Sequence, residues 1–497
     1  MKYMLRVSDP IIQLQLIDDI QRLGLDSHFK EEIKRALEFM PTSYDKGIVN
    51  DLHSTSLYFR LRRQHGFAVS QSMFDGFKDQ SGAFMENLSM DMKGMLSLYE
   101  ASHFAFEGEE LMNHARAFTT KCLESVSGHL QMEPQVTHTL ELPLCQWMQR
   151  LEARWYIDYL HDKRGEINPA LLEFAKLGFN MSLNVHQSEL KELSGWWIDL
   201  GLARKLSFVR DRLVESFFCA AAILPELQFG NSRKALTKVV TMIITIDDLY
   251  DVYGLLDELE LFTKVVERWD INAMEQLPEN MKICALALEN ITNEIARDIM
   301  REEGWDALPY LRCEWVKLCK SFLVEARWHA KGQLPTLEEY LQNAWISSSG
   351  PVLLIHSFFL TRQKITPELI DCIIASPDII RSPSMVFRLC NDLVTGKAEL
   401  ERGDAPASIH CYMNDAGVSE AMACEHIKKL IDLEWKAMNE QSFVLSPFSK
   451  EFNVICMNLA RMSHCLYNHG DGIGSPGKRT ANNVSSLLME PVGSKKI

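Results

Sequence analysis

The sequence lacks the patterns that mark several common classes of protein. None of its 12 cysteines forms a CxxC pair, so it has no zinc or iron–sulfur spacing, and free thiols are expected. No apolar run is long enough for a transmembrane helix, and the N-terminus lacks the apolar core of a secretory signal. Basic residues (52) are outnumbered by acidic ones (67), and the net charge of -15 argues against binding to nucleic acid or to an anionic membrane.

Signals of β-structure and of nucleotide binding are missing too. The chain has no sustained alternation of apolar and polar residues, no Gly-rich phosphate loop and no GxSxG nucleophile elbow. Apolar residues recur instead every three or four positions, as they do across 12–23 and 92–100. Gly24 is expected to end the first of these helices, and Asp26 and Ser27 to cap the next. The chain is therefore predicted to be all-α.

The length favours two domains, because 497 residues exceed what a single hydrophobic core usually organises. A polar run at 189–192 leads into Gly195 and a pair of tryptophans. We place the division there, which gives an N-terminal helical domain, residues 1–195, and a C-terminal domain, residues 196–497.

An acidic stretch, DDLYD at 247–251, follows eight mostly apolar residues. On a helix, Asp247 and Asp251 are four apart and share a face, whereas Asp248 points about 100° away. Paired carboxylates in an apolar setting suit a hard cation such as Mg²⁺, which takes its other ligands from water and phosphate. An acidic helix end that faces solvent is the alternative, and Gly254 suits the end of that helix.

A second polar pattern follows Arg388. Asn391, Thr395 and Glu399 are spaced by four and so stack on one face of a helix, with Arg388 close to the same face. Three oxygen ligands in a line suit one further Mg²⁺. A solvated polar face would look the same, so the pattern alone leaves both interpretations open.

Two further features are weaker signals. Arg210 and Arg212 flank an aspartate; such a group is usually a surface salt bridge, but arginine also binds phosphate oxygens through two donors. Tyr467 and Asp471 lie in a Gly-rich segment, 467–474, that suits either a mobile lid or a plain loop.

A capping box at Thr336 and Glu339 predicts the start of a helix. Further along, Gly350 and Pro351 predict a break in the apolar helical pattern. This break is either a simple turn between two helices or a kink whose carbonyls point into a cavity.

The arginine pair, the DDLYD stretch and the Asn-Thr-Glu pattern together resemble, in order and spacing, three signatures of plant class I terpene synthases. The stretches 150–156 and 324–328 are similar to the same family, and the similarity extends over essentially the whole chain. The resemblance implies a two-domain all-α fold, with a relict N-terminal helical domain and a C-terminal helical bundle that holds the active site.

The resemblance also implies roles for individual residues. In that family three Mg²⁺ ions bind the diphosphate of a prenyl substrate, and Mn²⁺ is an alternative metal. By similarity, the metal ligands are Asp247 and Asp251, with Asp248 in support, and Asn391, Thr395 and Glu399. The substrate-binding and catalytic residues are Arg210, Arg212 and Arg388, with Asp247, Asp251 and Asn391 also close to the substrate, and Tyr467 and Asp471 manage a proton.

The implied reaction is loss of diphosphate from a geranyl or farnesyl chain, after which the allylic cation is quenched by water or loses a proton. Aromatic candidates for shielding that cation are Phe217, Phe218, Trp315, Trp328 and Trp345. A tandem-arginine motif associated with cyclising relatives is absent, and the chain starts after the place where it would stand. Cys219 stands where many relatives carry tryptophan. Both features resemble the subfamily that makes acyclic alcohols, so linalool and nerolidol are the expected products.

Three other interpretations remain: a synthase of cyclic or olefinic monoterpenes, a chain-elongating prenyltransferase, and a catalytically silent helical protein that binds an apolar ligand. Prenyltransferases use a second aspartate cluster where this chain has Asn-Thr-Glu, and a silent protein has no need of six metal-ligand groups. We expect a monomer whose partner is a prenyl diphosphate, with neither nucleic acid nor membrane. We also expect it in the cytoplasm, or in the plastid if the natural N-terminus is longer.

Overall fold

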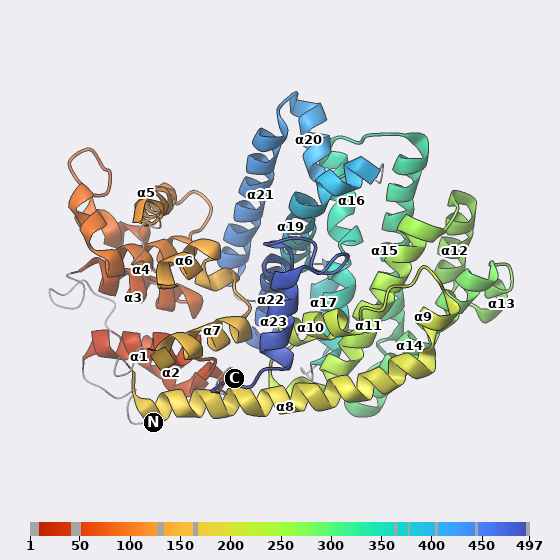
Figure 1. Ribbon diagram of the computed structural model, residues 1–497, viewed down its shortest axis with the longest axis horizontal. Coiled ribbons are helices and arrows are strands. Elements are labelled where there is room, and N and C mark those ends of the chain that lie inside the picture. Colours follow the sequence, from red (N-terminus) through yellow and green to blue (C-terminus); the bar gives the residue numbers. More distant parts are fainter. Residues whose placement is uncertain are drawn as a thin grey trace. The chain divides into compact units, whose positions relative to one another are not determined.

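The computed structural model describes residues 9–40, 51–126, 134–162, 167–361, 365–375, 378–402, 406–442 and 446–493. The chain forms two compact units. Unit 1 comprises residues 1–182, 436–446 and 490–497, and unit 2 comprises residues 183–435 and 447–489. Within the described ranges the regular structure is helical, apart from one isolated bridge between Lys78 and Phe84, which confirms the all-α prediction (Figure 1).

Unit 1 is built from short helices around one apolar core. Phe59, Leu98 and Ile157 have no measurable solvent exposure in that core. Its helices are α1 (Pro10–Arg22), α2 (Lys30–Glu38), α3 (Leu52–Gln64), α4 (Met92–Ser102), α5 (Glu110–Val126), α6 (Pro134–Glu141), α7 (Gln149–Asp162) and the first part of α8 (Pro169–Leu200).

The first two helix boundaries test the sequence-based predictions. Gly24 has a left-handed backbone (φ +67°) just after α1, which confirms the expected end of that helix. The expectation that Asp26 or Ser27 caps the next helix is wrong. These residues form a short 3₁₀ turn, and α2 starts behind Phe29 without a side-chain cap. The apolar Phe29 is buried there, so packing rather than capping determines the start.

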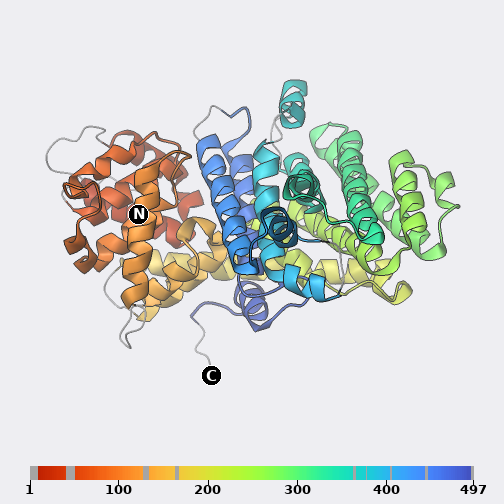
Figure 2. The same cartoon turned by 90° about the horizontal axis from the view of Figure 1, so that it is seen from above.

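Unit 2 is a bundle of longer helices, several of which are seen nearly end-on in Figure 2. Its helices are α9 (Leu202–Lys205), α10 (Leu213–Ile223), α11 (Gly230–Asp248), α12 (Leu256–Arg268), α13 (Ile271–Met274), α14 (Glu279–Glu303), α15 (Leu308–Lys331), α16 (Leu337–Ser347), α17 (Gly350–Leu360), α18 (Pro367–Ala375), α19 (Asp378–Arg402), α20 (Ser408–Ala416), α21 (Glu420–Gln441), α22 (Lys450–Tyr467) and α23 (Lys478–Leu488). Both α8 and α21 contribute residues to the two units.

The helices that carry the candidate site residues pack directly on one another. In unit 2, α10 contacts α11 and α22, while α19 contacts α16, α17 and α22. The long α11 buries Val239, Met242 and Ile246 along its apolar face and ends in the acidic stretch. The amphipathic pattern of α11 therefore places Asp247 at the end of a largely buried helix.

The break after α16 is confirmed. The capping box forms at the start of α16, where Thr336 N–H donates to Glu339 Oε2 (3.0 Å). The helix ends at Ser347, and Ser349 adopts a left-handed backbone (φ +66°) that is strained for any residue other than glycine. A Cβ at Gly350 would lie 2.2 Å from Ser384 Oγ, so only glycine lets α17 approach α19 this closely.

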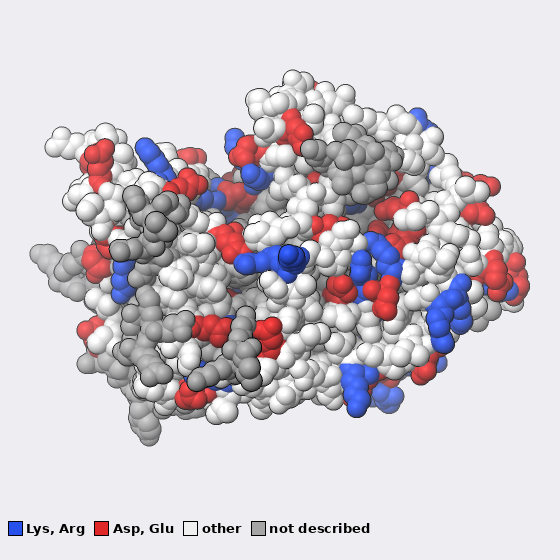
Figure 3. Space-filling model, viewed as in Figure 1, with Lys and Arg blue, Asp and Glu red and all other residues white. Residues whose placement is uncertain are grey.

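Residue 195 lies inside the continuous helix α8 rather than in a loop. The division into domains 1–195 and 196–497 therefore stays a prediction. Among the residues that the structure describes, no helix combines the length and apolar character needed to cross a membrane. Figure 3 shows acidic and basic side chains interspersed over one face of the molecule.

Candidate active site

The DDLYD stretch lies where α11 passes into a π-helical turn, Leu249–Tyr253. Gly254 N–H donates to Leu249 C=O (2.9 Å), which is the five-residue spacing of a π-helix. Four successive residues of an α-helix rotate about 40° more than one full turn. A π-helical turn contains more residues, so it reduces this excess rotation. Asp247 and the exposed Asp251 therefore stay near one face, although the expected α-helix gives way to a π-turn between them.

Side-chain packing anchors the π-turn against α12 and α15. Tyr250 Oη is hydrogen-bonded to Thr263 Oγ1 (2.8 Å), and its ring lies 5.5 Å from that of Phe322. A Cβ at Gly254 would lie 2.5 Å from Leu259 Cδ2. The helix therefore ends at a glycine, as expected, but close approach of α12 is the reason rather than a left-handed backbone.

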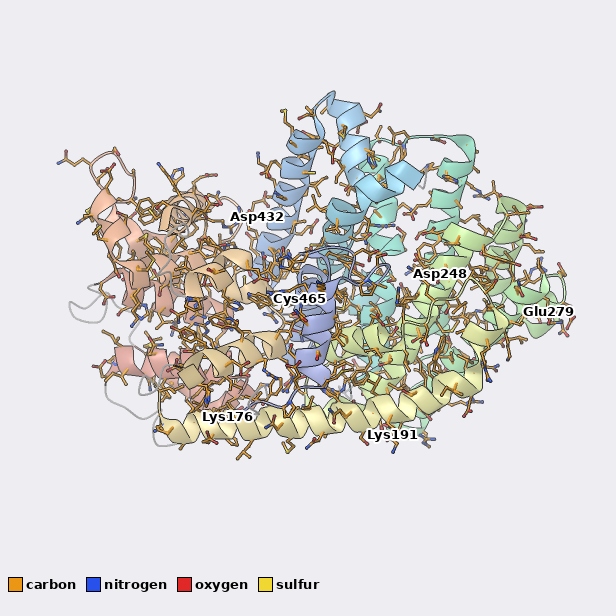
Figure 4. The ribbon with its side chains drawn as sticks, in the orientation of Figure 1. Lys176, Lys191, Asp248, Glu279, Asp432 and Cys465 are labelled. Atoms are coloured by element: carbon orange, nitrogen blue, oxygen red, sulfur yellow. The ribbon has the colours of Figure 1, made fainter. Side chains whose placement is uncertain are left out.

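Asp248 is buried and holds Arg210. Its Oδ1 lies 2.5 Å from Arg210 Nη2, and its Oδ2 accepts the backbone N–H of the same arginine (3.3 Å). Only 2% of the Asp248 side chain is exposed, and Figure 4 shows it at the end of α11 within the bundle. This carboxylate fixes an arginine, and its supporting role at a metal stays a prediction.

Asp247 is more exposed than its neighbour Asp248. Its Oδ2 lies 3.7 Å from Arg210 Nη2, and 41% of its side chain is exposed. Enough protein surrounds it that burial, followed by the charge of Asp248, raises the pKa of Asp247 to about 6. Arg210 and Arg388 oppose this rise and Glu325 adds to it. Charges from α11, α15, α19 and the segment before α10 therefore converge at one carboxylate.

Arg212 contacts the Gly-rich segment. Its Nη2 donates to Gly474 C=O (3.1 Å), and its Nη1 lies 3.7 Å from Glu215 Oε1. Asp211, between the two arginines, accepts the indole N–H of Trp197 (3.0 Å). The three residues of this short motif are therefore directed at three different partners rather than at one another.

Asp471 organises the segment that follows α22. Its Oδ1 accepts the backbone N–H groups of Ile473 (3.1 Å) and Gly474 (2.7 Å). A Cβ at Gly474 would lie 3.2 Å from Arg210 Nη1, so the segment folds against that guanidinium. Its function as a lid stays a prediction.

Tyr467, the last residue of α22, is buried beside the same groups. Burial, followed by the charge of Asp471, raises the pKa of Tyr467 well above its usual value, and the Cys219 thiol and Asp247 act in the same direction. The phenol is therefore neutral and keeps its proton, and its part in a proton step stays a prediction. Burial also raises the pKa of Cys219 to about 12, which makes that thiol unreactive.

The second polar pattern lies on α19. Asn391 is half-buried and Thr395 is buried, and Thr395 Oγ1 donates to the backbone C=O of Asn391 (3.1 Å). The hydroxyl oxygen keeps lone pairs that can bind a metal. Glu399 continues the same helix, but its side chain lies outside the described residues.

Arg388 is held by residues that sequence reasoning missed. Its Nη2 donates to Glu325 Oε1 (2.9 Å) and Oε2 (3.1 Å) and to Ser347 Oγ (2.6 Å). Its Nη1 lies 4.0 Å from Asp392 Oδ1. The only sequence signal for Glu325 was its place in a stretch similar to the family, because its partner is 63 positions away.

Asp392 is likewise a structural member of the site. It is buried, and both its oxygens accept the hydroxyl of Tyr340 (3.0 and 2.9 Å). Its Oδ2 also accepts the backbone N–H of Ser408 (3.1 Å). This carboxylate therefore ties α19 to α16 and α20, next to Asn391.

The aromatic candidates differ in burial. Phe217, Phe218 and Trp315 are fully buried, whereas Trp345 is half-buried. Trp328 packs against a small cluster around Tyr340. Shielding of a cation by any of these rings stays a prediction.

The donor set suits a hard cation that also takes oxygen ligands from substrate and water. No group of three or more His, Cys, Asp or Glu side chains in the described part of the chain could hold a metal alone. The donors divide instead between α11 with its π-turn and α19, and all of them are oxygen atoms, which Mg²⁺ prefers and supplements with phosphate and water. The raised pKa of Asp247 indicates negative charge that a bound cation would relieve.

Comparison with known proteins accounts for this arrangement. Residues 198–437 match the terpene synthase family, metal binding domain, and residues 2–140 match the terpene synthase N-terminal domain. The crystal structure of isoprene synthase from grey poplar leaves, in complex with three Mg²⁺ ions and dimethylallyl-S-thiolodiphosphate, has a TM-score of 0.94 and 46% sequence identity to this chain. The similarity covers 99% of this chain and 95% of that one.

Curated relatives cover almost the whole chain. Myrcene synthase of Quercus ilex is 50% identical over 494 residues, 98% of this chain and 82% of the relative. Geraniol synthase of Cinnamomum tenuipile is 48% identical over 500 residues, 99% and 82% of the two chains. Alpha-thujene synthase TPS3 of Litsea cubeba is 51% identical over 491 residues, 98% and 84%.

The fold and site thus define a two-domain class I terpenoid synthase, an enzyme that acts on a prenyl diphosphate. The chain belongs to the terpene synthase family, and its second domain is the metal-binding domain of that family.

Proposed function

We propose that this protein is a monoterpene synthase that ionises geranyl diphosphate with Mg²⁺ and gives mainly acyclic products. The chief product would be the tertiary alcohol linalool, with nerolidol from farnesyl diphosphate. The observation that carries the proposal is the convergence of Arg210, Arg388 and the perturbed Asp247 on one place in a metal-binding terpene synthase domain.

The basic residues of this chain would bind and orient the diphosphate. Arg210 is fixed by Asp248, Arg212 by Gly474, and Arg388 by Glu325 and Ser347, so each guanidinium approaches the substrate already ordered. Ordered donors stabilise charge that develops on the leaving oxygens without reorganising during the reaction.

The metal ligands would be Asp247 and Asp251 on one side and Asn391, Thr395 and Glu399 on the other. Mg²⁺ or Mn²⁺ bound to these residues would supply positive charge to the departing diphosphate. The poplar structure holds three Mg²⁺ ions, and we propose the same number here. Ionisation of the allylic C–O bond then depends on stabilising the leaving diphosphate.

The product class depends on what surrounds the allylic cation. Cys219 is buried near Tyr467. The family resemblance implies that its small thiol takes the place of an indole. A missing ring removes one surface that would stabilise a cyclised cation, so early capture by water is favoured. The similarity to myrcene and geraniol synthases, which are named for acyclic C10 products, supports this choice.

A cyclic monoterpene is the second candidate product. The observation in its favour is the 51% identity to alpha-thujene synthase TPS3, which is named for a cyclic product. A difference of one methylene in an apolar pocket is worth about 1–3 kcal/mol, so single pocket residues can decide between such products.

One experiment tests the proposal. The purified protein is incubated with Mg²⁺ and geranyl diphosphate, or farnesyl diphosphate, and volatiles are analysed by gas chromatography. Linalool as the main C10 product supports it, and mainly ring compounds would reject the acyclic product while leaving ionisation in place. Absence of diphosphate release from either substrate would reject the function itself.

Assembly and location complete the proposal. We propose a monomer that lies either in the cytoplasm or in the plastid. The word chloroplastic in the names of the oak and Litsea relatives supports the plastid. Light scattering tests the first point. Imaging of a fluorescent fusion to the full protein encoded by the native transcript tests the location. Signal in plastids would reject the cytoplasm.

A further inference from the structure

The carboxylate of Glu325 joins three helices of unit 2. It lies on α15 and accepts from Arg388 Nη2 on α19, at 2.9 Å to Oε1 and 3.1 Å to Oε2. At the end of α16 it accepts from Ser347 Oγ (2.5 Å) and from Asn343 Nδ2 (3.1 Å). Its side chain is only 12% exposed, so water competes little for these contacts.

Burial of this ion pair is not by itself evidence that the pair stabilises the fold. A buried ion pair loses hydration on both partners, and replacing it with apolar groups of similar size is often neutral or stabilising. What the pair does provide is geometry. A planar guanidinium that is held at one nitrogen by a carboxylate and a hydroxyl has a defined plane and direction.

Other groups limit the arginine further. Asp392 lies 4.0 Å from Nη1, and the ring of Tyr340 lies 6.0 Å from Arg388 Cζ. Tyr340 itself is fixed by donating its hydroxyl to Asp392. Four residues from α15, α16 and α19 thus surround one arginine, and Glu325 (2.9 Å) lies closer to it than Asp392 (4.0 Å) does.

We propose that Glu325 is a positioning residue that aims the Arg388 guanidinium at the diphosphate oxygens while the C–O bond of the substrate breaks. The inference rests on the proposed function, in which Arg388 binds diphosphate. Glu325 touches no reacting atom and acts only through the arginine. An arginine freed from it would still attract the bound anion at long range, but it would have to be ordered again in each transition state. The loss therefore falls on kcat rather than on KM.

The chain supplies a matched control: a carboxylate on α12 that pairs with an arginine on the same helix as Glu325. Glu260 accepts a hydrogen bond from Arg327 Nη2 (2.7 Å). Arg327 lies on α15, two residues after Glu325. The side chains of Glu260 and Arg327 are 37% and 45% exposed. Such a pair contributes little. Glu260→Gln removes a carboxylate from an arginine of α15 without touching the site.

The test compares kinetics of the full-length protein with geranyl diphosphate and Mg²⁺. Glu325→Gln should lower kcat about tenfold and change KM by less than about twofold, whereas Glu260→Gln should change neither. Glu325→Asp keeps the charge and should recover part of kcat. Thermal unfolding of each variant accompanies the kinetics, so that loss of folded protein is corrected for.

A double-mutant cycle separates positioning from a structural role. Lysine at 388 keeps the charge but cannot use the fork of donors, so Glu325→Gln should cost less than about twofold when it is added to Arg388→Lys. An equal cost in both backgrounds, or an unchanged kcat for Glu325→Gln in an active protein, overturns the inference alone. A wild-type chain that releases no diphosphate would instead reject the proposed function.

Discussion

Units 1 and 2 each contain a cluster of charged side chains, and the two clusters differ in how completely their partners satisfy them. In unit 1, the buried Arg63 bonds both oxygens of Glu109 (2.5 and 2.6 Å) and the carbonyls of Val69 and Phe104. Only 2% of the Arg63 side chain is exposed. Every charge in this cluster has a close partner of opposite sign or a hydrogen bond.

The cluster of unit 2 is only half closed. Asp248 is buried against Arg210, but 34% of the Arg210 side chain and 41% of the Asp247 side chain stay exposed. The pKa of Asp247 is raised, so this carboxylate carries its charge at a cost in the protein without ligands.

The difference separates two uses of charge. A closed cluster contributes to one folded arrangement, and breaking it leaves an uncompensated buried ion. An open cluster costs stability and is retained where a ligand completes it. Removing a charge from the closed cluster should therefore destabilise the protein, whereas removing Asp247 from the open cluster should stabilise the metal-free protein. The following predictions test this difference.

The largest effect is expected in unit 1. Arg63→Ala leaves the Glu109 carboxylate without its main partner and should lower the free energy of unfolding by about 3–5 kcal/mol, measured by urea denaturation. Lys34→Ala removes an exposed pair with Glu38 (3.7 Å) and should cost less than about 0.5 kcal/mol. A cost below about 1 kcal/mol for Arg63→Ala would show that this cluster does not stabilise the unit.

The next effect is on turnover. Asp247→Ala should lower kcat roughly 100- to 1000-fold, because it removes a carboxylate at the point where the site charges converge. Far-ultraviolet circular dichroism should stay that of the wild type. Asp298→Ala, which removes an exposed pair with Arg301 (2.9 Å), is the control and should leave kcat unchanged. If Asp247→Ala retains more than about a third of the wild-type kcat at matched Mg²⁺, Asp247 is not a metal ligand.

Periodicity predicted the helices well because it reports which face of a helix is buried. The C-terminal end of α1 at Gly24 and the capping box of α16 followed from local chemistry and are confirmed. The cap at Asp26 or Ser27 is wrong because burial of Phe29 outweighed a local hydrogen bond. Local rules thus succeed where the competing tertiary contact is weak.

The sequence predicted which residues make up the candidate site, but not which partners their side chains contact. Spacing placed Asp247, Asp251 and the α19 residues on common faces, yet it could not show the π-turn, which depends on a hydrogen bond shifted by one residue. Nor could it show that Asp248 turns to Arg210, or that Glu325 holds Arg388, since these partners lie 38 and 63 positions apart. Such pairings arise from helix packing, which a single sequence does not reveal.

A smaller effect is expected for the arginine that contacts the Gly-rich segment. Arg212→Lys keeps the charge but loses the fork of donors, so kcat should fall about tenfold and early-released alcohols should increase. The exposed Arg204, whose Nη2 donates to Ile198 C=O (2.8 Å), provides the control: Arg204→Lys should be neutral. An unchanged rate and product profile for Arg212→Lys would assign that arginine to local structure only.

The smallest expected effect is a change in the free energy of unfolding of the metal-free protein, and its sign is the informative result. In metal-free protein, Asp247→Asn should raise the free energy of unfolding, by less than about 1 kcal/mol because the side chain is 41% exposed. The folded pKa of about 6 lies above the ordinary pKa of the aspartate side chain, 3.8, so the folded state binds the extra proton, and wild-type stability falls as pH rises from about 4 to 6. The advantage of the asparagine should therefore be full above pH 6 and vanish below pH 4.

The matched change in unit 1 should have the opposite sign. Asp18→Asn weakens the buried pair with Arg60 (2.5 Å) and should lower the free energy of unfolding at neutral pH. Adding Mg²⁺ with inorganic diphosphate should reverse the order of wild type and Asp247→Asn, because only the carboxylate gains from the cation. Thermal unfolding at pH 4 and pH 7, with and without metal, measures all three comparisons. Destabilisation of the metal-free protein by Asp247→Asn at pH 7 would mean that its cluster is as closed as that of unit 1.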